Sequence, residues 1–159
     1  MESAMGAAAS LRAAHFYPLV GSLFKAIGVP AVVSNQGDTS NRIDLILTHP
    51  SDPIPVEVKS RTEVEAVNVK AIQQALENKL ALARMSGHTT LSASSSLVVG
   101  FANPPARSGI RELLDDIESA YGIRIGIISL RRLYEILISV NITGQAFDRD
   151  ILTSLKGTL

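Results

Sequence analysis

The feature that most constrains the fold is a pair of strand-like segments separated by a short proline-containing loop. Residues 42–48 and 54–60 are rich in apolar and β-branched side chains, and the five residues between them include Pro50 and Pro53. Runs of this length and composition, bounded by turn residues, are typical of β-strands. Because a connection this short joins antiparallel neighbours, we expect a β-hairpin with the rest of the fold built around its sheet.

Helical and strand-like segments alternate around this hairpin. The expected helices cover residues 11–28, 110–121, 131–139 and 144–156, with a longer one that starts at Thr62 or Asn68 and ends near residue 86. The further strands are expected at residues 29–34, 97–102 and 124–130. A hairpin followed by strand–helix–strand crossovers predicts an α/β fold with a mixed sheet, antiparallel in the hairpin and parallel afterwards, flanked by α-helices.

The composition limits how the chain is organised and what it can bind. A chain of 159 residues corresponds to one domain, which we place at residues 11–159, after a tail of uncertain origin at residues 1–10. Lys plus Arg and Asp plus Glu each number 15, so any site for a polyanion such as DNA must be local. The absence of cysteine excludes disulfides and thiolate metal sites and is compatible with a cytoplasmic protein, and no apolar run is long enough to predict a membrane span.

Three charged residues in the two hairpin strands suggest a chemical site. Asp44 interrupts an apolar strand between Ile43 and Leu45, and Glu57 and Lys59 lie two residues apart, on the same face of the next strand. Whether Asp44 shares that face depends on the register of the hairpin, which the sequence leaves open. Two carboxylates suit Mg²⁺ or another hard divalent cation, and a lysine beside it can orient a water molecule and neutralise charge on a phosphate.

Simpler interpretations of these residues remain open. Asp44 could instead be tied to the turn at residues 37–41 or paired with Arg42, and Asp38 could replace it as a ligand. Glu57 and Lys59 could form a surface ion pair on an edge strand. The acid-x-Lys spacing also occurs a second time, at residues 77–79 (Glu-Asn-Lys) of the long helix, where we interpret it as a solvated helical face.

The run Asn41-Arg42-Ile43-Asp44-Leu45-Ile46-Leu47, followed by Val56-Glu57-Val58-Lys59-Ser60, resembles the PD-(D/E)xK nuclease superfamily, in particular its restriction-endonuclease and Holliday-junction-resolvase branches. The resemblance implies a restriction-endonuclease-like sheet, with Asp44 and Glu57 as ligands of Mg²⁺ or Mn²⁺ and Lys59 as the residue that assists water attack. Ile43 stands where the named motif has proline. Many members add a glutamate from the first helix, whereas residues 11–28 contain no acid. Some branches carry a catalytic glutamine in the helix after the lysine, a place that Gln73, our first choice, or Gln74 can fill.

The resemblance predicts a metal-dependent DNA endonuclease, namely a type II restriction endonuclease or its catalytic domain. A recognition domain could belong to a longer parent chain. A branched-DNA resolvase and a catalytically inactive nuclease-fold module that binds nucleic acid or protein are the alternatives. Arg42, Arg61 and Lys70 are the predicted DNA contacts. By analogy with nucleases that cut both strands of DNA, we expect a homodimer.

Overall fold

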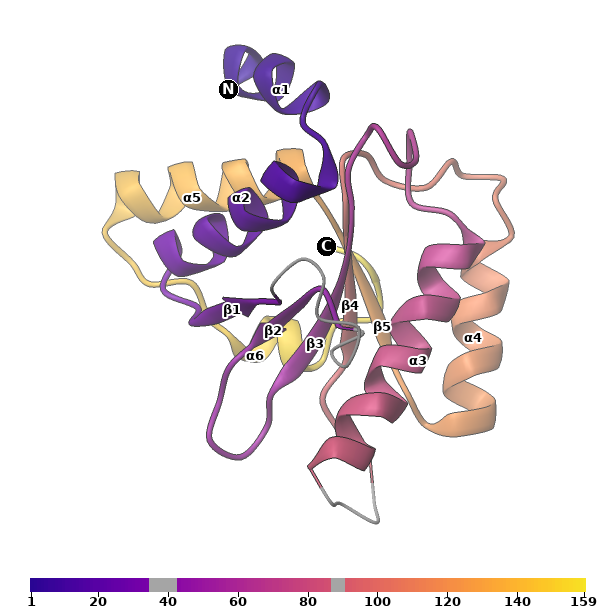
Figure 1. Cartoon of the computed structure of the whole chain (residues 1–159). Coiled ribbons are helices and arrows are strands. Elements are labelled where there is room, and N and C mark those ends of the chain that lie inside the picture. Colours follow the sequence, from indigo (N-terminus) through magenta and orange to yellow (C-terminus); the bar gives the residue numbers. More distant parts are fainter. Residues whose placement is uncertain (35–42, 87–90) are drawn as a thin grey trace.

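The computed structural model describes residues 1–34, 43–86 and 91–159 (Figure 1). The helices and strands follow one another in the order α1 (Glu2–Ala9), α2 (Ala13–Ala26), β1 (Ala31–Val33), β2 (Leu45–Leu47), β3 (Ile54–Lys59), α3 (Val69–Met85), β4 (Ser96–Gly100), α4 (Ile110–Tyr121), β5 (Ile125–Ser129), α5 (Leu130–Thr143), α6 (Asp150–Thr153) and β6 (Gly157–Thr158). None of the described helices is both long and apolar enough to cross a membrane.

The strands form one six-stranded sheet in which the spatial order equals the order along the chain. β1, β2 and β3 are antiparallel neighbours, and β3 to β6 run parallel. The predicted α/β class, the hairpin and the mixed sheet flanked by helices are therefore confirmed. In the hairpin, Leu45 pairs with Val56 and Leu47 with Ile54, which fixes the register that the sequence left open.

Helices cover both faces of the sheet and create two apolar cores. α2 and α5 lie over one face, and α3 and α4 lie over the other (Figure 1). β3 is buried along almost its whole length because it lies between β2 and β4. Val56 and Val58 belong to the core beneath α2, so the alternate residues Glu57 and Lys59 point to the α3 side.

The two ends of the described chain are more structured than the sequence indicates. Residues 2–9 form α1, whose Met5 and Ala8 are buried in the core beneath α2. The predicted helix at 144–156 is wrong in extent, because only α6 is helical and β6 follows it. The hydroxyl of Ser95 donates to the carbonyls of Thr153 and Leu155 at 3.0 and 2.7 Å, which holds this part of the chain beside β4. A two-residue strand carries no hydrophobic period by which it could have been predicted.

Of the two starts proposed for the long helix, the structure selects the later one. Asn68 is the N-cap of α3, and its side chain accepts a hydrogen bond from the backbone N–H of Ala71 at 3.0 Å. The earlier candidate, the Thr62 and Glu65 pair, does not begin a helix. Glu63 between them instead accepts hydrogen bonds from the backbone N–H and the hydroxyl of Ser60, at 2.9 and 2.8 Å, and so closes a turn directly after β3.

Candidate active site

The hairpin register brings Asp44 and Glu57 together. The pairing of Leu45 with Val56 places Asp44, one residue before β2, opposite Glu57. The Asp44 carbonyl accepts a hydrogen bond from Ser34 N–H at 3.0 Å, and its carboxylate Oδ2 accepts one from Val58 N–H at 2.9 Å. Asp44 therefore shares the face of the sheet on which Glu57 and Lys59 lie.

Glu57 is held by its own strand and by α3. It is only 3% exposed. Its Oε1 lies 2.7 Å from Lys59 Nζ, and its Oε2 accepts a hydrogen bond of 2.8 Å from the side-chain amide of Asn78 in α3. The interpretation of this pair as a surface contact on an edge strand is wrong, because β3 has neighbours on both sides and Glu57 is buried.

The charges of these three residues are strongly coupled. Burial, and then the negative charge of Glu57, raise the pKa of Asp44 to about 7, although the Val58 N–H and Lys59 act in the opposite direction. Burial tends to lower the pKa of Lys59, but its hydrogen bond to Glu57 and the charges of Glu57 and Asp44 outweigh burial and raise the pKa. When Asp44 is ionised, two carboxylates and one lysine leave one uncompensated negative charge in a partly desolvated site. The raised pKa of Asp44 reflects the cost of that charge, which a bound cation would offset.

The donor set fits a hard divalent cation with few protein ligands. Asp44 and Glu57 are the residues that could hold it, since both supply carboxylate oxygens. Within residues 1–34, 43–86 and 91–159, no group of three or more His, Cys, Asp or Glu side chains is arranged to bind a metal. Mg²⁺ keeps several of its own waters and is bound by one or two carboxylates in many phosphoryl-transfer sites, so a pair of carboxylates is compatible with it.

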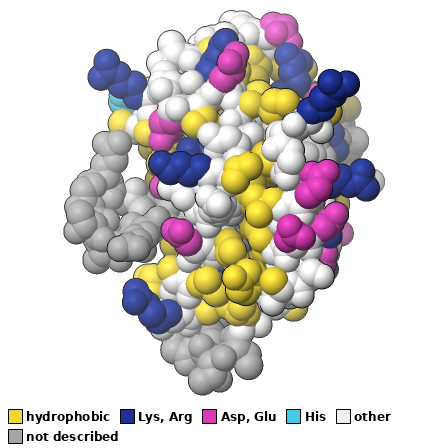
Figure 2. Space-filling view, turned by 90° about the vertical axis from the view of Figure 1, so that its right-hand side faces the viewer, with side chains coloured by type: hydrophobic (Ala, Val, Ile, Leu, Met, Phe, Trp, Pro, Cys, Tyr) yellow, Lys and Arg dark blue, Asp and Glu magenta, His cyan; other side chains and the backbone are white. Residues whose placement is uncertain are grey.

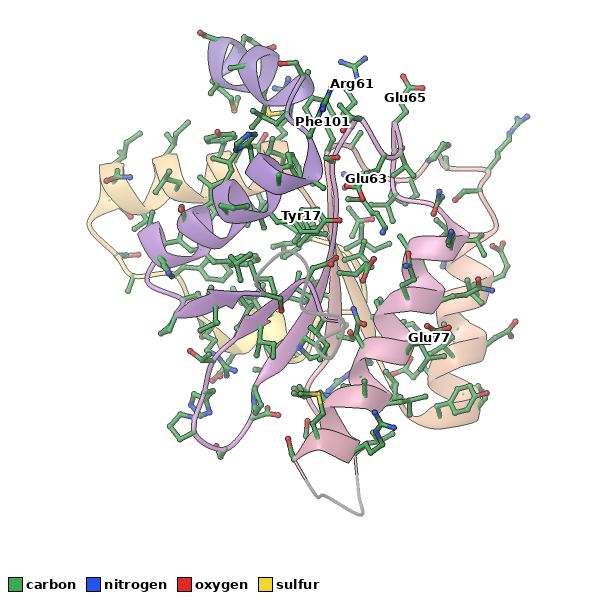
Figure 3. The ribbon with its side chains drawn as sticks, in the orientation of Figure 1. Tyr17, Arg61, Glu63, Glu65, Glu77 and Phe101 are labelled. Atoms are coloured by element: carbon green, nitrogen blue, oxygen red, sulfur yellow. The ribbon has the colours of Figure 1, made fainter. Side chains whose placement is uncertain are left out.

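A second network joins α2 to the turn that follows Lys59. The Tyr17 hydroxyl of α2 donates a hydrogen bond of 2.9 Å to Oε1 of Glu63 (Figure 3). Burial, and then the nearby charge of Asp44, raise the pKa of Tyr17 well above its ordinary value, so the phenol stays protonated and keeps donating. The sequence analysis did not predict a role for Tyr17 or Glu63. The acid expected from the first helix is absent, and in its place the phenol of Tyr17 contacts Glu63 of the turn.

Asn78 and Lys79 are placed differently from the prediction. Residues 77–79 were interpreted as a solvated face, but Asn78 and Lys79 are only 4% and 2% exposed, and only Glu77 is exposed. Figure 3 shows Glu77 on α3, away from the contact between Tyr17 and Glu63. The interpretation was wrong for the other two side chains because their polar partners lie on other elements, which helical periodicity does not reveal.

The two glutamines of α3 differ in their surroundings. Gln73, the predicted catalytic residue, is exposed. Gln74 is half-buried, and its Oε1 is buried without a hydrogen-bond partner among the described residues. It lies one helical turn before Asn78, on the same face of α3. The structure thus places Gln74, the alternative, on the face of α3 that carries Asn78, the partner of Glu57, and a catalytic role for either glutamine stays a prediction.

The predicted DNA contacts are only partly described. Arg42 lies outside the described residues, and so does Asp38, the alternative to Asp44 as a metal ligand. Arg61 is exposed in the segment that follows β3, and Lys70 is exposed in the first turn of α3. The Arg61 guanidinium lies 5.3 Å from the centre of the Phe101 ring. On the face formed by α3 and α4, charged side chains of both signs surround an apolar strip (Figure 2). The part of this face that the structure describes therefore shows no continuous basic surface, in agreement with the balanced charge.

Comparisons of the chain with family models, with curated proteins and with solved structures found no match.

Proposed function

We propose that the protein is a metal-dependent endonuclease that hydrolyses DNA phosphodiester bonds, with a restriction-endonuclease-like fold. The observation that carries the proposal is the placement of Asp44 opposite Glu57 across the β2–β3 hairpin, with Lys59 on the same face and 2.7 Å from Glu57. The separate Tyr17–Glu63 network fixes the turn directly after Lys59 and so helps to hold the end of β3 in place.

Each residue has a distinct part in this chemistry. A divalent cation held by Asp44 and Glu57 would supply Lewis-acid polarisation of a phosphoryl oxygen and a more acidic water. Lys59 orients the attacking water and stabilises the negative charge that develops on the phosphate, and its raised pKa keeps it cationic while it does so. Asn78 holds the Glu57 carboxylate in place through the 2.8 Å hydrogen bond, so that it faces Asp44.

DNA binding in this proposal depends on local contacts. Arg61, two residues after β3, and Lys70, in the first turn of α3, are exposed and so are free to contact DNA phosphates. A homodimer would place a second copy of the site on the opposite strand, which two-strand cleavage requires.

Incubation with supercoiled plasmid in Mg²⁺ or Mn²⁺ tests the proposal directly. We expect nicking and linearisation that EDTA abolishes, and loss of both in Asp44→Asn. Glu77→Gln is the matched control, because it removes an exposed glutamate of the other acid-x-Lys sequence. Cleavage that survives in Asp44→Asn would reject the assignment, and comparison of a four-way junction with linear duplex in the same assay separates a resolvase from a restriction-type enzyme.

A specific observation favours a second candidate, a module that binds DNA without cutting it. Both carboxylate oxygens of Glu57 already have partners, Lys59 and Asn78, so a metal would have to compete with them. In that case the plasmid stays intact with every divalent cation, whereas a gel-shift assay still detects a complex with the same DNA.

A further inference from the structure

A buried lysine outside the carboxylate site forms a closed polar cluster with two serines. Lys79 Nζ of α3 donates hydrogen bonds to Ser92 Oγ at 2.8 Å and to Ser94 Oγ at 2.7 Å. The two hydroxyl oxygens lie 2.9 Å apart, so all three side chains contact one another. No carboxylate among the described residues lies within ion-pair distance of Lys79, which is unusual for a lysine that is only 2% exposed.

The surroundings favour the neutral form of this lysine. Burial is the main reason that the pKa of Lys79 falls to about 8; the charge of Arg124 acts in the same direction, and the charge of Asp52 opposes both. A protonated Lys79 donates to both serines. Once it is neutral, its lone pair can accept the proton of Ser92 across the same 2.8 Å contact.

The cluster is held in place from several directions. Ser94 and Ser95 are buried, and Ser95 is fixed to the carbonyls of Thr153 and Leu155. The guanidinium of Arg124 donates to the carbonyl of Ala93 at 2.8 Å, between the two serines of the cluster. Ser92 therefore projects from a backbone that is anchored directly after it.

Ser92 is also the exposed member of the cluster. It is solvent-exposed, whereas Ser94 and Lys79 are buried behind it. A small pocket of about 40 Å³ reaches both Lys79 and Ser92 and is further lined by Ser51, Leu82 and Ser86. The pocket has room for only about one water molecule, so a reagent approaches the exposed Ser92 oxygen from the solvent, with Lys79 behind it.

We propose that Ser92 is a nucleophile activated by Lys79 and that it accepts acyl groups from small activated esters. Ser92 Oγ forms a bond to the acyl carbon as the bond between that carbon and the leaving-group oxygen breaks. The hydroxyl proton passes to Lys79 Nζ and then to the departing alcohol or phenol, so the products are an acyl-serine and the free leaving group. Ser94 orients Lys79 through its 2.7 Å hydrogen bond and is a positioning residue. A nucleophile, a base within hydrogen-bond reach and a third group that orients the base are the arrangement found in activated serines.

Acetylation by p-nitrophenyl acetate tests this inference on the full chain. Release of p-nitrophenol and the intact mass report the reaction, and peptide mapping locates the acetyl group. We expect one acetyl group on Ser92, none in Ser92→Ala, and acylation at least about tenfold slower in Lys79→Met, which keeps an unbranched side chain one atom shorter and without the amine. Ser86→Ala is the matched control, because it removes another hydroxyl of the same pocket and should leave the rate unchanged.

Three results would refute the proposal that Ser92 is an activated nucleophile. Absence of acetylation in the wild type, an acetyl group that persists in Ser92→Ala, or an unchanged rate in a folded Lys79→Met would each refute the proposal. Thermal melting confirms that each variant is folded. Ser94→Ala removes the hydroxyl that orients Lys79 and should slow the acylation. Ser94→Thr retains a hydroxyl and should recover that rate, which a purely structural role of Ser94 in packing would not explain.

Discussion

The same acid-x-Lys spacing occurs in β3 and in α3, but the acid and the lysine contact each other only in β3. In β3, Glu57 and Lys59 form an ion pair at 2.7 Å beside a second carboxylate. In α3, Glu77 is exposed while Lys79 is buried and bonded to serine hydroxyls. The difference follows from the period of the element: residues two apart share a face of a strand, but lie about 200° apart around a helix.

This contrast shows that a short motif has chemical meaning only within its element. In the strand, this spacing places Glu57 and Lys59 on the same face, where Lys59 lies close to the carboxylates of Glu57 and Asp44. The helix separates the same residue types and gives each of them different neighbours. The two lysines consequently have pKa shifts in opposite directions, raised for Lys59 and lowered for Lys79.

The largest expected effect is the difference in DNA cleavage rate between variants in which Lys59 or Lys79 is replaced. Lys59→Met should reduce the cleavage rate by about 10²–10³-fold, because it removes the positive charge beside the developing phosphate charge. Lys79→Met should leave that rate within about twofold, since Lys79 does not contact the carboxylates. Single-turnover cleavage of plasmid measures both, and equal losses in the two variants would contradict the assignment of the site to β3.

Next in size is the effect of Asp44→Asn on the stability of the metal-free protein. The folded carboxyl has a pKa of about 7 against its ordinary value of 3.8, so the folded state binds more protons between these values and stability falls as pH rises through that window. Asn cannot ionise but can still accept the hydrogen bond from Val58. The variant should be more stable than the wild type by roughly 1–3 kcal/mol at pH 8 and close to it below pH 4, as urea unfolding can measure.

Lys79→Met should also stabilise the protein, but with the opposite dependence on pH. The folded pKa of about 8 lies below the ordinary lysine value of 10.5, so the unfolded state binds more protons between these values and wild-type stability rises as pH increases across that window. The variant should gain roughly 1–2 kcal/mol at pH 7, and the gain should shrink as pH approaches 10.5. Lys59→Met should instead lower the melting temperature at pH 7, because it leaves two carboxylates without their counter-charge.

The smallest expected effect concerns the hydrogen bond between Asn78 of α3 and Glu57 of β3. Asn78→Ala removes the amide that holds Glu57 without changing any charge. We expect cleavage to fall by about tenfold, mainly through weaker binding of Mg²⁺ or Mn²⁺, because the loss of a hydrogen-bond partner of a metal ligand typically costs about 10- to 100-fold in affinity. Titration with Mn²⁺ measures the change, and an unaltered metal affinity would show that Asn78 has only a packing role.

Much of the fold could be predicted from the sequence. The hairpin, the parallel strands and most helices were expected because apolar runs, turn residues and helical spacing are local signals. The register of the hairpin was not, since it depends on which side chains pack beneath α2. Val56 and Val58 enter that core, and their burial decides the side on which Asp44, Glu57 and Lys59 lie.

The buried face of α3 could be predicted only in part. Ile72 and Leu80 recur at helical spacing in α3, which predicts that both belong to one buried face. Ile72 is buried, but Leu80 is 43% exposed. Asn78 and Lys79 are buried instead, because Glu57 and the Ser92–Ser94 segment provide hydrogen bonds that offset the loss of water. Such long-range polar pairing leaves no periodic trace in the sequence.

The order of strands in the sheet has a consequence for synthesis on the ribosome. Each strand pairs with its immediate predecessor in the chain, so the sheet can be extended strand by strand as the chain emerges. The layer of helices over one face cannot be completed in the same stepwise way. α2 precedes β1, whereas α5, which packs against α2, follows β5. The apolar surface later covered by α5 stays open until residues 130–143 have left the exit tunnel, and during that interval a nascent chain is most in need of a chaperone.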